Sequence, residues 1–459
     1  MNIEADSSIF DDDGRPKRTG TVWTAGAHII TAVIGSGVLT LAWAIAQMGW
    51  IAGPIALLVF SLITLLTATI LSDCYRAPDG TRNYVYKDAV NSYLGGIKVQ
   101  LCALAQYTYL FGVTIGYSIT TAISLVAMKK AICFHKHGHE HDCTMSNNRF
   151  IVVFGLIQIL LCQVPNFHKL SFLSFIAAIM SFGYASIGLG LSIAKIGEGK
   201  HVTTSLAGKP IGKGFSATDK MWNCFAAIGN IAFAYAFSVV LIEIQDTIRS
   251  GVPESKVMKQ ASLIGILIST VFYMLCGILG YAAFGNEAPG NFLTGFGFYE
   301  PYWLVFIANL FIAVHLFGAY QVFCQPIFAV VEGWTTTKWP GNKFINREYT
   351  VVGSFKLSFF RLIWRSFYVV FVTLVAMLLP FFNDFVGLLG AMSFWPLTVF
   401  FPIEMYIARH KVSRWSSGRG LLLMLLSAFC LITSLLAAAG SVRGLIHSLR
   451  TFKPLHSRS

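Results

Sequence analysis

Eleven runs of mostly apolar residues occupy most of the chain, and they restrict its fold more than any other feature. A helix needs about 20 apolar residues to cross a bilayer, and most of the runs are that long. Hydrophobic residues make up 55% of the 459 positions and charged residues only 12%, which excludes a soluble protein. We therefore predict an all-α polytopic membrane protein with about eleven transmembrane helices. The expected spans are 21–47, 51–73, 98–128, 150–165, 169–194, 221–245, 260–284, 302–331, 359–380, 383–408 and 418–442.

The positive charges predict how the chain is oriented. Residues 1–20 are polar and lack the apolar core of a signal peptide, so they are expected as a cytosolic tail. With this tail inside, inner segments hold 21 of the 34 Lys and Arg residues, as the positive-inside rule requires. The transmembrane domain then covers 21–442, and an odd number of spans puts the tail 443–459 outside the cell. The basic residues behind the net charge of +13 lie between apolar runs, so nucleic-acid binding is not predicted.

The first run is interrupted near its middle by Gly35-Ser36-Gly37. Backbone groups inside lipid must be satisfied internally, so an unwound segment is tolerated only where it lines a polar cavity and can bind a solute. Five spans later, glycine and Asn230 interrupt residues 228–235 in the same way. Paired breaks predict an inverted repeat. Repeat one would be about 21–194, repeat two about 221–408, and 418–442 an extra, peripheral helix. Tight packing of small residues is the alternative explanation of each break.

The two breaks offer opposite partial charges to a solute. A half-helix that starts after Gly37 presents free N–H groups and a positive dipole end, which suit a carboxylate. Carbonyl groups freed between Asn230 and Ala234 would suit an ammonium group, so the pair matches the two ends of an amino acid. Aromatic residues and a hydroxyl from the third span would complete the site, although such aromatics also face lipid. The candidate substrate-binding residues are Ile34, Gly35, Ser36, Gly37, Val38, Tyr107, Asn230, Ala232, Phe233 and Tyr235.

Ionisable residues within spans are costly and are therefore functional candidates. His28 precedes the first break by two turns, and His315 lies in the middle of the eighth span. Either could take up a proton at mildly acidic pH, since free histidine titrates near about 6.5. Glu243 ends the sixth span and could pair with Lys or Arg across an inner gate. These three residues are the proton-coupling candidates. A neutral histidine that hydrogen-bonds a neighbouring helix is the alternative.

A polar loop from Cys133 to Cys143 contains four alternating histidines. Alternation on a strand would place the imidazoles on one face, so metal binding is one interpretation. A disulfide closing a solvated outer loop is the favoured interpretation, because the outer side is oxidising. No metal site is predicted. His137 and Asp142 also fit a His-x4-Asp acyltransferase pattern, which no surrounding feature supports.

Long blocks of this sequence resemble the plant amino acid permeases of the amino acid/auxin permease superfamily. One of them is Phe394-Trp-Pro-Leu-Thr-Val-Phe-Phe-Pro-Ile-Glu404. The others are 19–25, 28–53, 166–169, 241–247, 280–286, 295–301 and 318–326. The resemblance runs from about residue 11 to residue 454. It implies a LeuT-type inverted repeat of five plus five helices with helices 1 and 6 broken, a plasma-membrane location, and proton-coupled import of amino acids. It does not imply a sodium site.

The chain departs from the resembled family at two positions. Family members commonly carry Asp where this chain has Asn230, and an acidic residue where it has Phe306. Two potential intramembrane carboxylates are therefore missing, which leaves His28, His315 and Glu243 as the proton-coupling candidates.

We therefore expect a proton-coupled amino acid symporter in the plasma membrane, not an enzyme, with amino acids, protons and membrane lipid as its partners and with no cofactor. Import of a related carboxylic acid such as auxin on the same fold is the first alternative. A membrane-embedded acyltransferase with His315 as base is the second. The sequence leaves the oligomeric state open.

Overall fold

The computed structural model describes residues 10–15, 17–138, 140–164, 171–199, 201–296, 302–352, 355–379 and 381–451. The resembled block at 166–169, His139 of the histidine-rich loop and residues 452–459 of the C-terminal tail lie outside this described part.

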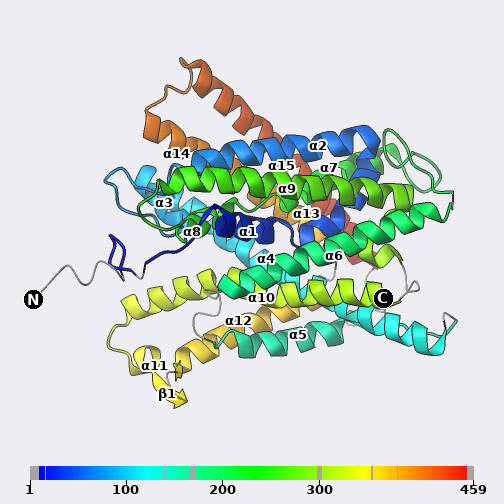
Figure 1. Cartoon of the computed structure of the whole chain (residues 1–459), viewed down its shortest axis with the longest axis horizontal. Helices are drawn as coiled ribbons and strands as arrows, with labels where there is room; N and C mark the ends of the chain where they lie inside the picture. Colours follow the sequence, from blue (N-terminus) through cyan, green and yellow to red (C-terminus); the bar gives the residue numbers. More distant parts are fainter. Residues whose placement is uncertain are drawn as a thin grey trace, which may run out of the picture.

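Long helices dominate the structure and lie roughly parallel to one another (Figure 1). The α-helices are α1 (Val22–Val33), α2 (Leu41–Ser72), α3 (Tyr86–Tyr93), α4 (Gly96–His137), α5 (Asn147–Leu161), α6 (Ser171–Gly197), α7 (Ala217–Ala234), α8 (Leu241–Gln245), α9 (Glu254–Phe284), α10 (Tyr302–Lys338), α11 (Lys343–Asn346), α12 (Phe359–Leu378), α13 (Phe382–Ser393), α14 (Phe401–His410) and α15 (Gly418–Thr451). Short 3₁₀ segments are η2 (Ser36–Thr40), η4 (Ser238–Val240), η5 (Gly285–Glu287) and η6 (Phe292–Phe296), and η7 (Phe394–Phe400) is π-helical. The N-terminal segment, α3 and α8 lie at one end of the molecule, called the N-terminal end below.

The predicted eleven spans are confirmed. Nine helical stretches in the described residues are long and apolar enough to cross a membrane, and α1 and α5 are shorter apolar helices. One of the nine, Ser36–Ser72, contains the end of the first span and the whole second span, because the chain turns at Gly49. Gly49 has a φ of 83°, and a Cβ there would lie 2.2 Å from the backbone nitrogen of Gly208. Only glycine fits this turn.

The first and sixth spans are both discontinuous, as predicted. Helix α1 starts at a capping box formed by Thr21 and Thr24, and it ends at Val33. The next two residues leave the helical conformation before η2 begins. In the sixth span, residues 235–237 separate α7 from η4 and α8.

The second break begins five residues after Asn230, which lies inside α7. The prediction that Asn230 interrupts the helix is therefore wrong. The Asn230 side chain donates to the carbonyl of Ala226 one turn earlier, so it fits within a continuous helix. The neighbouring Gly229 is needed for packing, since a Cβ there would lie 2.4 Å from the carbonyl oxygen of Gly387 on α13.

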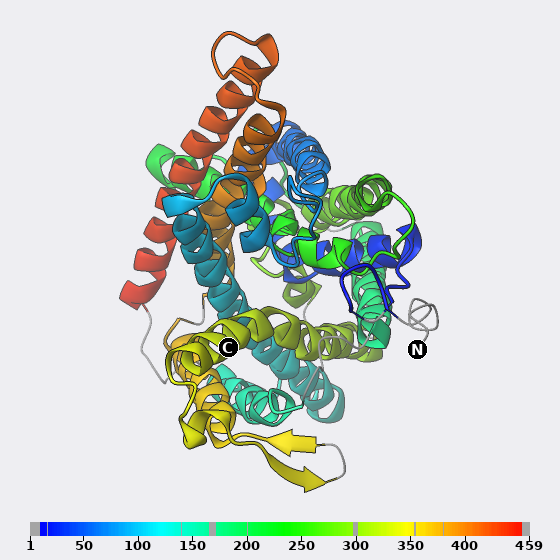
Figure 2. The ribbon, with the colours of Figure 1, turned by 90° about the vertical axis from the view of Figure 1, so that its left-hand side faces the viewer.

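One feature at the edge of the molecule differs from expectation. An antiparallel hairpin of β1 (Tyr349–Val352) and β2 (Phe355–Leu357) follows α11 in a segment that was not predicted to contain strands. It projects from the helices on the side opposite to α15 (Figure 2). Helix α15, expected at the periphery, packs along one side against α7 and α13 and leaves many large apolar side chains exposed on its other side.

Candidate binding site at the two helix breaks

The carbonyl groups at the first break all accept hydrogen bonds from hydroxyl groups. Ser181 and Tyr184 on α6 donate to the carbonyl of Ile34 at 2.7 and 3.1 Å. Tyr184 also lies 3.0 Å from the carbonyl of Gly35, and Tyr273 on α9 donates to that of Val33. Side chains on neighbouring helices thus meet the requirement that unwound backbone inside a membrane be satisfied.

The second break is held by hydroxyl groups in the same manner. Tyr273 lies 2.9 Å from the carbonyl of Ala234, the last residue of α7. Tyr109 on α4 donates to the carbonyl of Ala236 at 3.2 Å. The Tyr235 hydroxyl donates to Thr270, which lies one turn before Tyr273 on α9. Helix α9 therefore contacts the second break at two successive turns.

The two breaks touch each other. A Cβ at Gly37 would lie 2.9 Å from the Cα of Ala234 and 3.3 Å from the Phe233 ring, so only glycine allows this approach. Because α1 ends at Val33 and α7 at Ala234, the negative ends of two helix dipoles meet here. Segments η2 and η4 begin close by, and their first N–H groups provide the opposite polarity. One small region therefore offers donors for an anion and acceptors for a cation.

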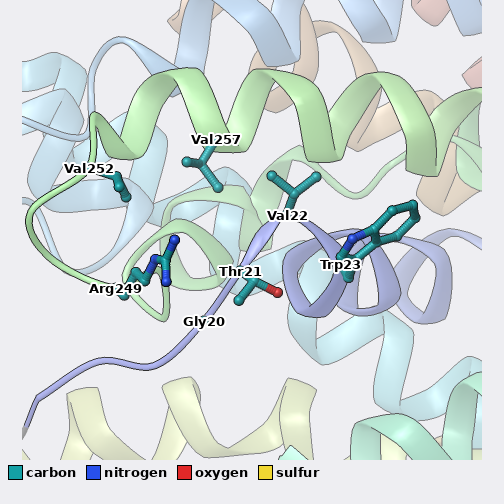
Figure 3. A pocket seen from close by; sticks show the side chains of 7 residues that line it. All are labelled: Gly20, Thr21, Val22, Trp23, Arg249, Val252 and Val257. Carbon is teal, nitrogen blue, oxygen red and sulfur yellow. The ribbon is translucent and has the colours of Figure 1, made fainter.

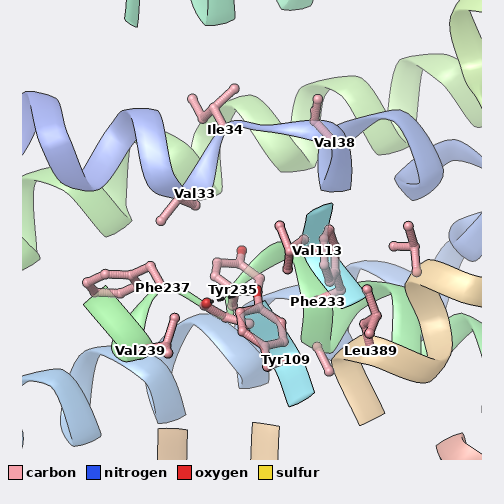
Figure 4. Close-up of a cluster of buried hydrophobic side chains, with 14 of the residues drawn as sticks. Val33, Ile34, Val38, Tyr109, Val113, Phe233, Tyr235, Phe237, Val239 and Leu389 are labelled. Atoms are coloured by element: carbon pink, nitrogen blue, oxygen red, sulfur yellow. Dashed lines mark hydrogen bonds between the residues drawn. The ribbon is translucent and has the colours of Figure 1, made fainter. Parts of the chain in front are cut away.

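Apolar side chains fill the space beside the breaks (Figure 4). Val38, Val113, Phe233 and Leu389 come together from η2, α4, α7 and α13, and Tyr109 lies beneath them. The tyrosine that α4 turns toward the breaks is thus Tyr109. The predicted Tyr107 is only partly buried and lies near enough to Glu243 for an electrostatic interaction.

The remaining predicted binding residues fall into two groups. Ile34, Gly35, Ser36, Ala232 and Tyr235 lie at or beside the breaks and are buried. Asn230 packs instead against α13, where a Cβ at Gly387 would lie 3.0 Å from its Nδ2. The Oδ1 atom of Asn230 is buried and has no hydrogen-bond partner among the described residues.

Among the proton-coupling candidates, His315 lies beside the first break. The Nδ1 atom of His315 lies 3.2 Å from both the Ser181 hydroxyl and the Ala177 carbonyl. Its Nε2 atom is buried without a partner in the described part of the chain, and a Cβ at Gly35 would lie 3.8 Å from it. His28 lies on α1, partly buried, more than one turn before the first break. Phe306, on the same helix as His315, is partly buried.

A charged network lies at the N-terminal end of the molecule. Arg18 binds the carboxylate of Asp246 at 2.8 Å and its carbonyl at 2.6 Å, and it also binds Asp11 and Asp13. Tyr75 donates to Asp246 at 2.6 Å, and Arg82 binds Asp12 and Glu254. Side chains from residues 11–18 thus link α8 to the α2–α3 connection and to the start of α9.

The acid that pairs across this end is therefore Asp246 and not Glu243. One Glu243 oxygen accepts from the Tyr86 backbone at 3.3 Å, and the other has no partner within the described ranges. The Arg18 guanidinium holds the pKa of Asp13 well below its usual value. For Asp11, burial acts in the opposite direction, but hydrogen bonds from Arg18 outweigh it and lower the pKa.

A shallow hollow lies beside the network. Gly20, Thr21, Val22, Trp23, Arg249, Val252 and Val257 line it (Figure 3). It is separate from the helix breaks, and the Trp23 side chain at its edge is exposed.

At the opposite end, Cys133 and Cys143 form a disulfide bond. His135 stacks on Tyr302, and the rings of His137 and His141 are tilted to each other with their centroids 4.9 Å apart. No group of three or more metal-ligating side chains occurs in the part of the chain that the structure describes.

Sequence reasoning missed the hydroxyl groups that bind the breaks. Ser181, Tyr184 and Tyr273 are isolated polar residues in apolar spans, and a buried hydroxyl needs an acceptor. An isolated hydroxyl residue in an apolar span is therefore a signal of a functional position. Which carbonyl accepts its hydrogen bond depends on how the helices pack.

The chain is similar to known membrane transporters over almost all of its length. It matches the family described as transmembrane amino acid transporter protein over residues 18–447. It is 62% identical over 457 residues to Amino acid permease 6 of Arabidopsis thaliana, with 98% of this chain and 95% of the relative covered. It is 60% identical over 451 residues to Amino acid permease 8 of the same plant, with 97% and 95% covered. Among solved structures, MhsT in complex with L-phenylalanine matches with a TM-score of 0.57 at 13% identity and with 93% of this chain and 100% of that chain covered.

Proposed function

This chain belongs to the transmembrane amino acid transporter family, and on that premise we propose that its two helix breaks bind the carboxylate and the ammonium group of an imported amino acid. Its fold is of the LeuT type, an inverted repeat of five plus five helices with one extra helix. The family and the relatives are transporters and not enzymes, so the acyltransferase alternative falls away.

The observation that supports the proposal most directly is that the two breaks touch each other. In the proposal, the substrate carboxylate binds the N–H groups of the first break between Gly35 and Val38, at the start of η2. The ammonium group binds the carbonyls that end α1 and α7, where the negative dipole ends of both helices meet. A carboxylic acid without an amino group, such as auxin, would leave the second set of contacts unused.

The surroundings of the breaks favour amino acids with uncharged side chains. Val38, Val113, Phe233 and Leu389 are apolar and lie together beside the breaks (Figure 4). A cationic side chain in such a pocket would be buried without a counter-ion, which is costly. Lysine and arginine are therefore expected to be the poorest substrates.

We further propose that import is coupled to protons and that His315 carries the coupled proton. The buried, unpartnered Nε2 atom near Gly35 supports His315 over His28 and Glu243. A proton on Nε2 would add a positive charge next to the carboxylate half of the site, so proton and substrate would favour each other's binding. One proton gains about 2.3 kcal/mol per 100 mV of membrane potential, which is enough for accumulation.

The proposed location is the plasma membrane, with the N-terminal end facing the cytosol and the C-terminal tail outside. The charged network around Arg18 would then be the inner closure of the transport path. The disulfide would face the oxidising exterior, as disulfides usually do.

Electrophysiology in a heterologous cell tests the proposal directly. Neutral amino acids should evoke an inward current that grows as external pH falls from about 7.5 to about 5.5, the range in which histidine titrates. Lysine and arginine should evoke little current, and excess neutral amino acids should abolish uptake of a labelled one. Electroneutral uptake that ignores pH would contradict proton coupling. Competition by auxin but not by amino acids would contradict the substrate assignment.

Replacing His315 should separate substrate binding from proton coupling. In His315→Gln, the amide keeps polar contacts with Ser181 and Ala177, but it does not take up a proton in this pH range. We expect a loss of about tenfold or more in uptake at pH about 5.5, so that uptake hardly varies with pH. The same substitution at His28 is the comparison and should retain the pH dependence. If His315→Gln keeps its acid stimulation and His28→Gln loses it, the assignment is wrong.

A further inference from the structure

A single tyrosine on α9 connects the two helix breaks. The hydroxyl of Tyr273 contacts the carbonyl of Val33, the last residue of α1, and lies 2.9 Å from the carbonyl of Ala234, the last residue of α7. Both carbonyls are at helix ends, where the regular donors of the helix stop. The carbonyl of Val33 also accepts from the Gly35 N–H at 2.8 Å, so that of Ala234 depends more on Tyr273. The Tyr273 side chain is fully buried. Its ring packs edge-on against Tyr235 of the second break, with the centroids 5.2 Å apart.

The hydroxyl has one proton for two acceptors. It can donate fully to only one carbonyl at a time, or weakly to both. A buried carbonyl without a donor is strongly unfavourable. Tyr273 therefore removes most of this penalty whenever no other donor is present between the breaks.

We propose that Tyr273 is a placeholder for the substrate ammonium group. The inference rests on the proposed function, in which that ammonium binds where these two helix ends meet. In the unloaded carrier, the Tyr273 hydroxyl satisfies the helix ends. When an amino acid binds, its ammonium group has three N–H donors and takes over the carbonyl of Ala234, while Tyr273 donates to that of Val33. Tyr273 is thus a positioning residue whose main effect is on the carrier that returns empty.

Two kinds of transport separate this role from a merely structural one. Net uptake requires the empty carrier to return across the membrane, whereas exchange of internal for external amino acid moves only loaded carriers. Without the hydroxyl, the loaded carrier remains satisfied by the ammonium group. In the empty carrier, the carbonyl of Ala234 then has no donor among the described residues, and that of Val33 keeps only the Gly35 N–H. The empty return step should therefore slow selectively.

The experiment compares Tyr273→Phe with the wild type in both assays, after correction for surface expression by biotinylation. We expect net uptake to fall about tenfold, equivalent to about 1.4 kcal/mol, while exchange stays within about twofold. The apparent KM in exchange should be unchanged or lower, because the substrate no longer competes with the hydroxyl. An equal fall in both assays, or a raised KM, would overturn the placeholder role.

Tyr320→Phe is the matched control. Tyr320 is another buried tyrosine in a spanning helix, and its hydroxyl has no hydrogen-bond partner among the described residues. Its removal should change neither assay.

A second variant covers the case in which Tyr273→Phe fails to reach the surface. Incorporating 3-fluorotyrosine at position 273 keeps the ring and makes the hydroxyl a stronger donor. The apparent KM should then rise by about twofold or more, and an unchanged KM would overturn the proposal. Failure of the underlying site is recognised separately, because Gly37→Val would then leave exchange intact whatever Tyr273 does.

Discussion

Gly37→Val is expected to abolish transport while the protein still reaches the cell surface. The Cβ of any larger residue at position 37 would lie 2.9 Å from the Cα of Ala234, closer than a Cβ approaches other atoms in proteins, and in tight contact at 3.2 Å from the Cβ of Ala234. Valine adds two further methyl groups at this point, so the breaks must separate. One substrate cannot contact both half-sites in good geometry once they are displaced by about 1 Å, and we expect uptake to fall by about 100-fold or more. Uptake of a labelled neutral amino acid, normalised to surface protein, measures the effect.

Two other glycines provide controls for this substitution. Gly318 lies in the spanning helix α10, and nothing lies within 4 Å of a Cβ placed there, so Gly318→Val should transport normally. Gly35 belongs to the same break as Gly37, but a Cβ there would meet only the His315 ring, at 3.8 Å. Gly35→Ala should therefore be much milder than Gly37→Ala. If Gly37→Val transports at the wild-type rate, the breaks do not form the substrate site.

The spans and the first break could be predicted because they depend on local sequence. Apolar length is sufficient to locate a membrane helix, and Gly35-Ser36-Gly37 weakens a helix wherever it occurs. The second break begins more than one turn after Asn230, where the sequence placed it, since Asn looks like a helix breaker in the sequence. In the structure its amide binds the helix itself, and the true interruption at residues 235–237 contains no glycine.

The side chains that complete the site depend on packing between distant segments. Tyr107 and Tyr109 are two positions apart on α4 and point in different directions, so the choice between them requires the rotation of that helix. The contact from Tyr273 to Val33 joins residues 240 positions apart. Glu243 and Asp246 lie one turn apart, and only the path of residues 11–18 shows that Asp246 meets Arg18. None of these relations has a periodic signature in the sequence.

Removing the Arg18 side chain should have the second large effect, because it would open the N-terminal end. The guanidinium is almost fully buried and binds three carboxylates, those of Asp11, Asp13 and Asp246. Removing one partner of a buried ion pair costs about 3–5 kcal/mol, because the remaining charge stays buried and unpaired. In Arg18→Ala, this free-energy cost destabilises only the closed state, in which the carboxylates are buried. The equilibrium should shift toward the open state by about 100-fold or more, and net uptake should collapse.

The native thiol of Cys74 reports this opening. Cys74 precedes Tyr75 of the network and is buried, and burial raises the pKa of its thiol to about 12. The thiolate that reacts with maleimide is therefore scarce in the closed state at neutral pH. Opening should expose Cys74, lower the pKa of its thiol and accelerate labelling in inside-out vesicles, with the site identified by mass spectrometry. Unchanged labelling together with normal uptake would contradict the closure role.

The pH dependence of this closure follows from the sign of the pKa shifts. A carboxylate whose pKa is lower in the closed state than in water stabilises closure above its ordinary pKa, and loses that effect only as pH falls through the lowered value. The pKa values of Asp11 and Asp13 are both lowered. Closure should therefore not vary between about pH 5.5 and about pH 7.5. Acid stimulation of uptake must then arise elsewhere, and Asp13→Asn should leave it intact.

Two further variants serve as a control for Arg18→Ala and as a test of whether the charge or the shape of the guanidinium matters. Arg249 lies near the network on the same face, but its exposed side chain lines the hollow of Figure 3, so Arg249→Ala should label and transport like the wild type. Arg18→Lys keeps the positive charge but cannot bind three carboxylates with one rigid fork. Its uptake and its Cys74 labelling should fall between those of the wild type and Arg18→Ala. If Arg18→Lys matches the wild type, charge alone holds the N-terminal end closed. If it matches Arg18→Ala, the geometry of the guanidinium does.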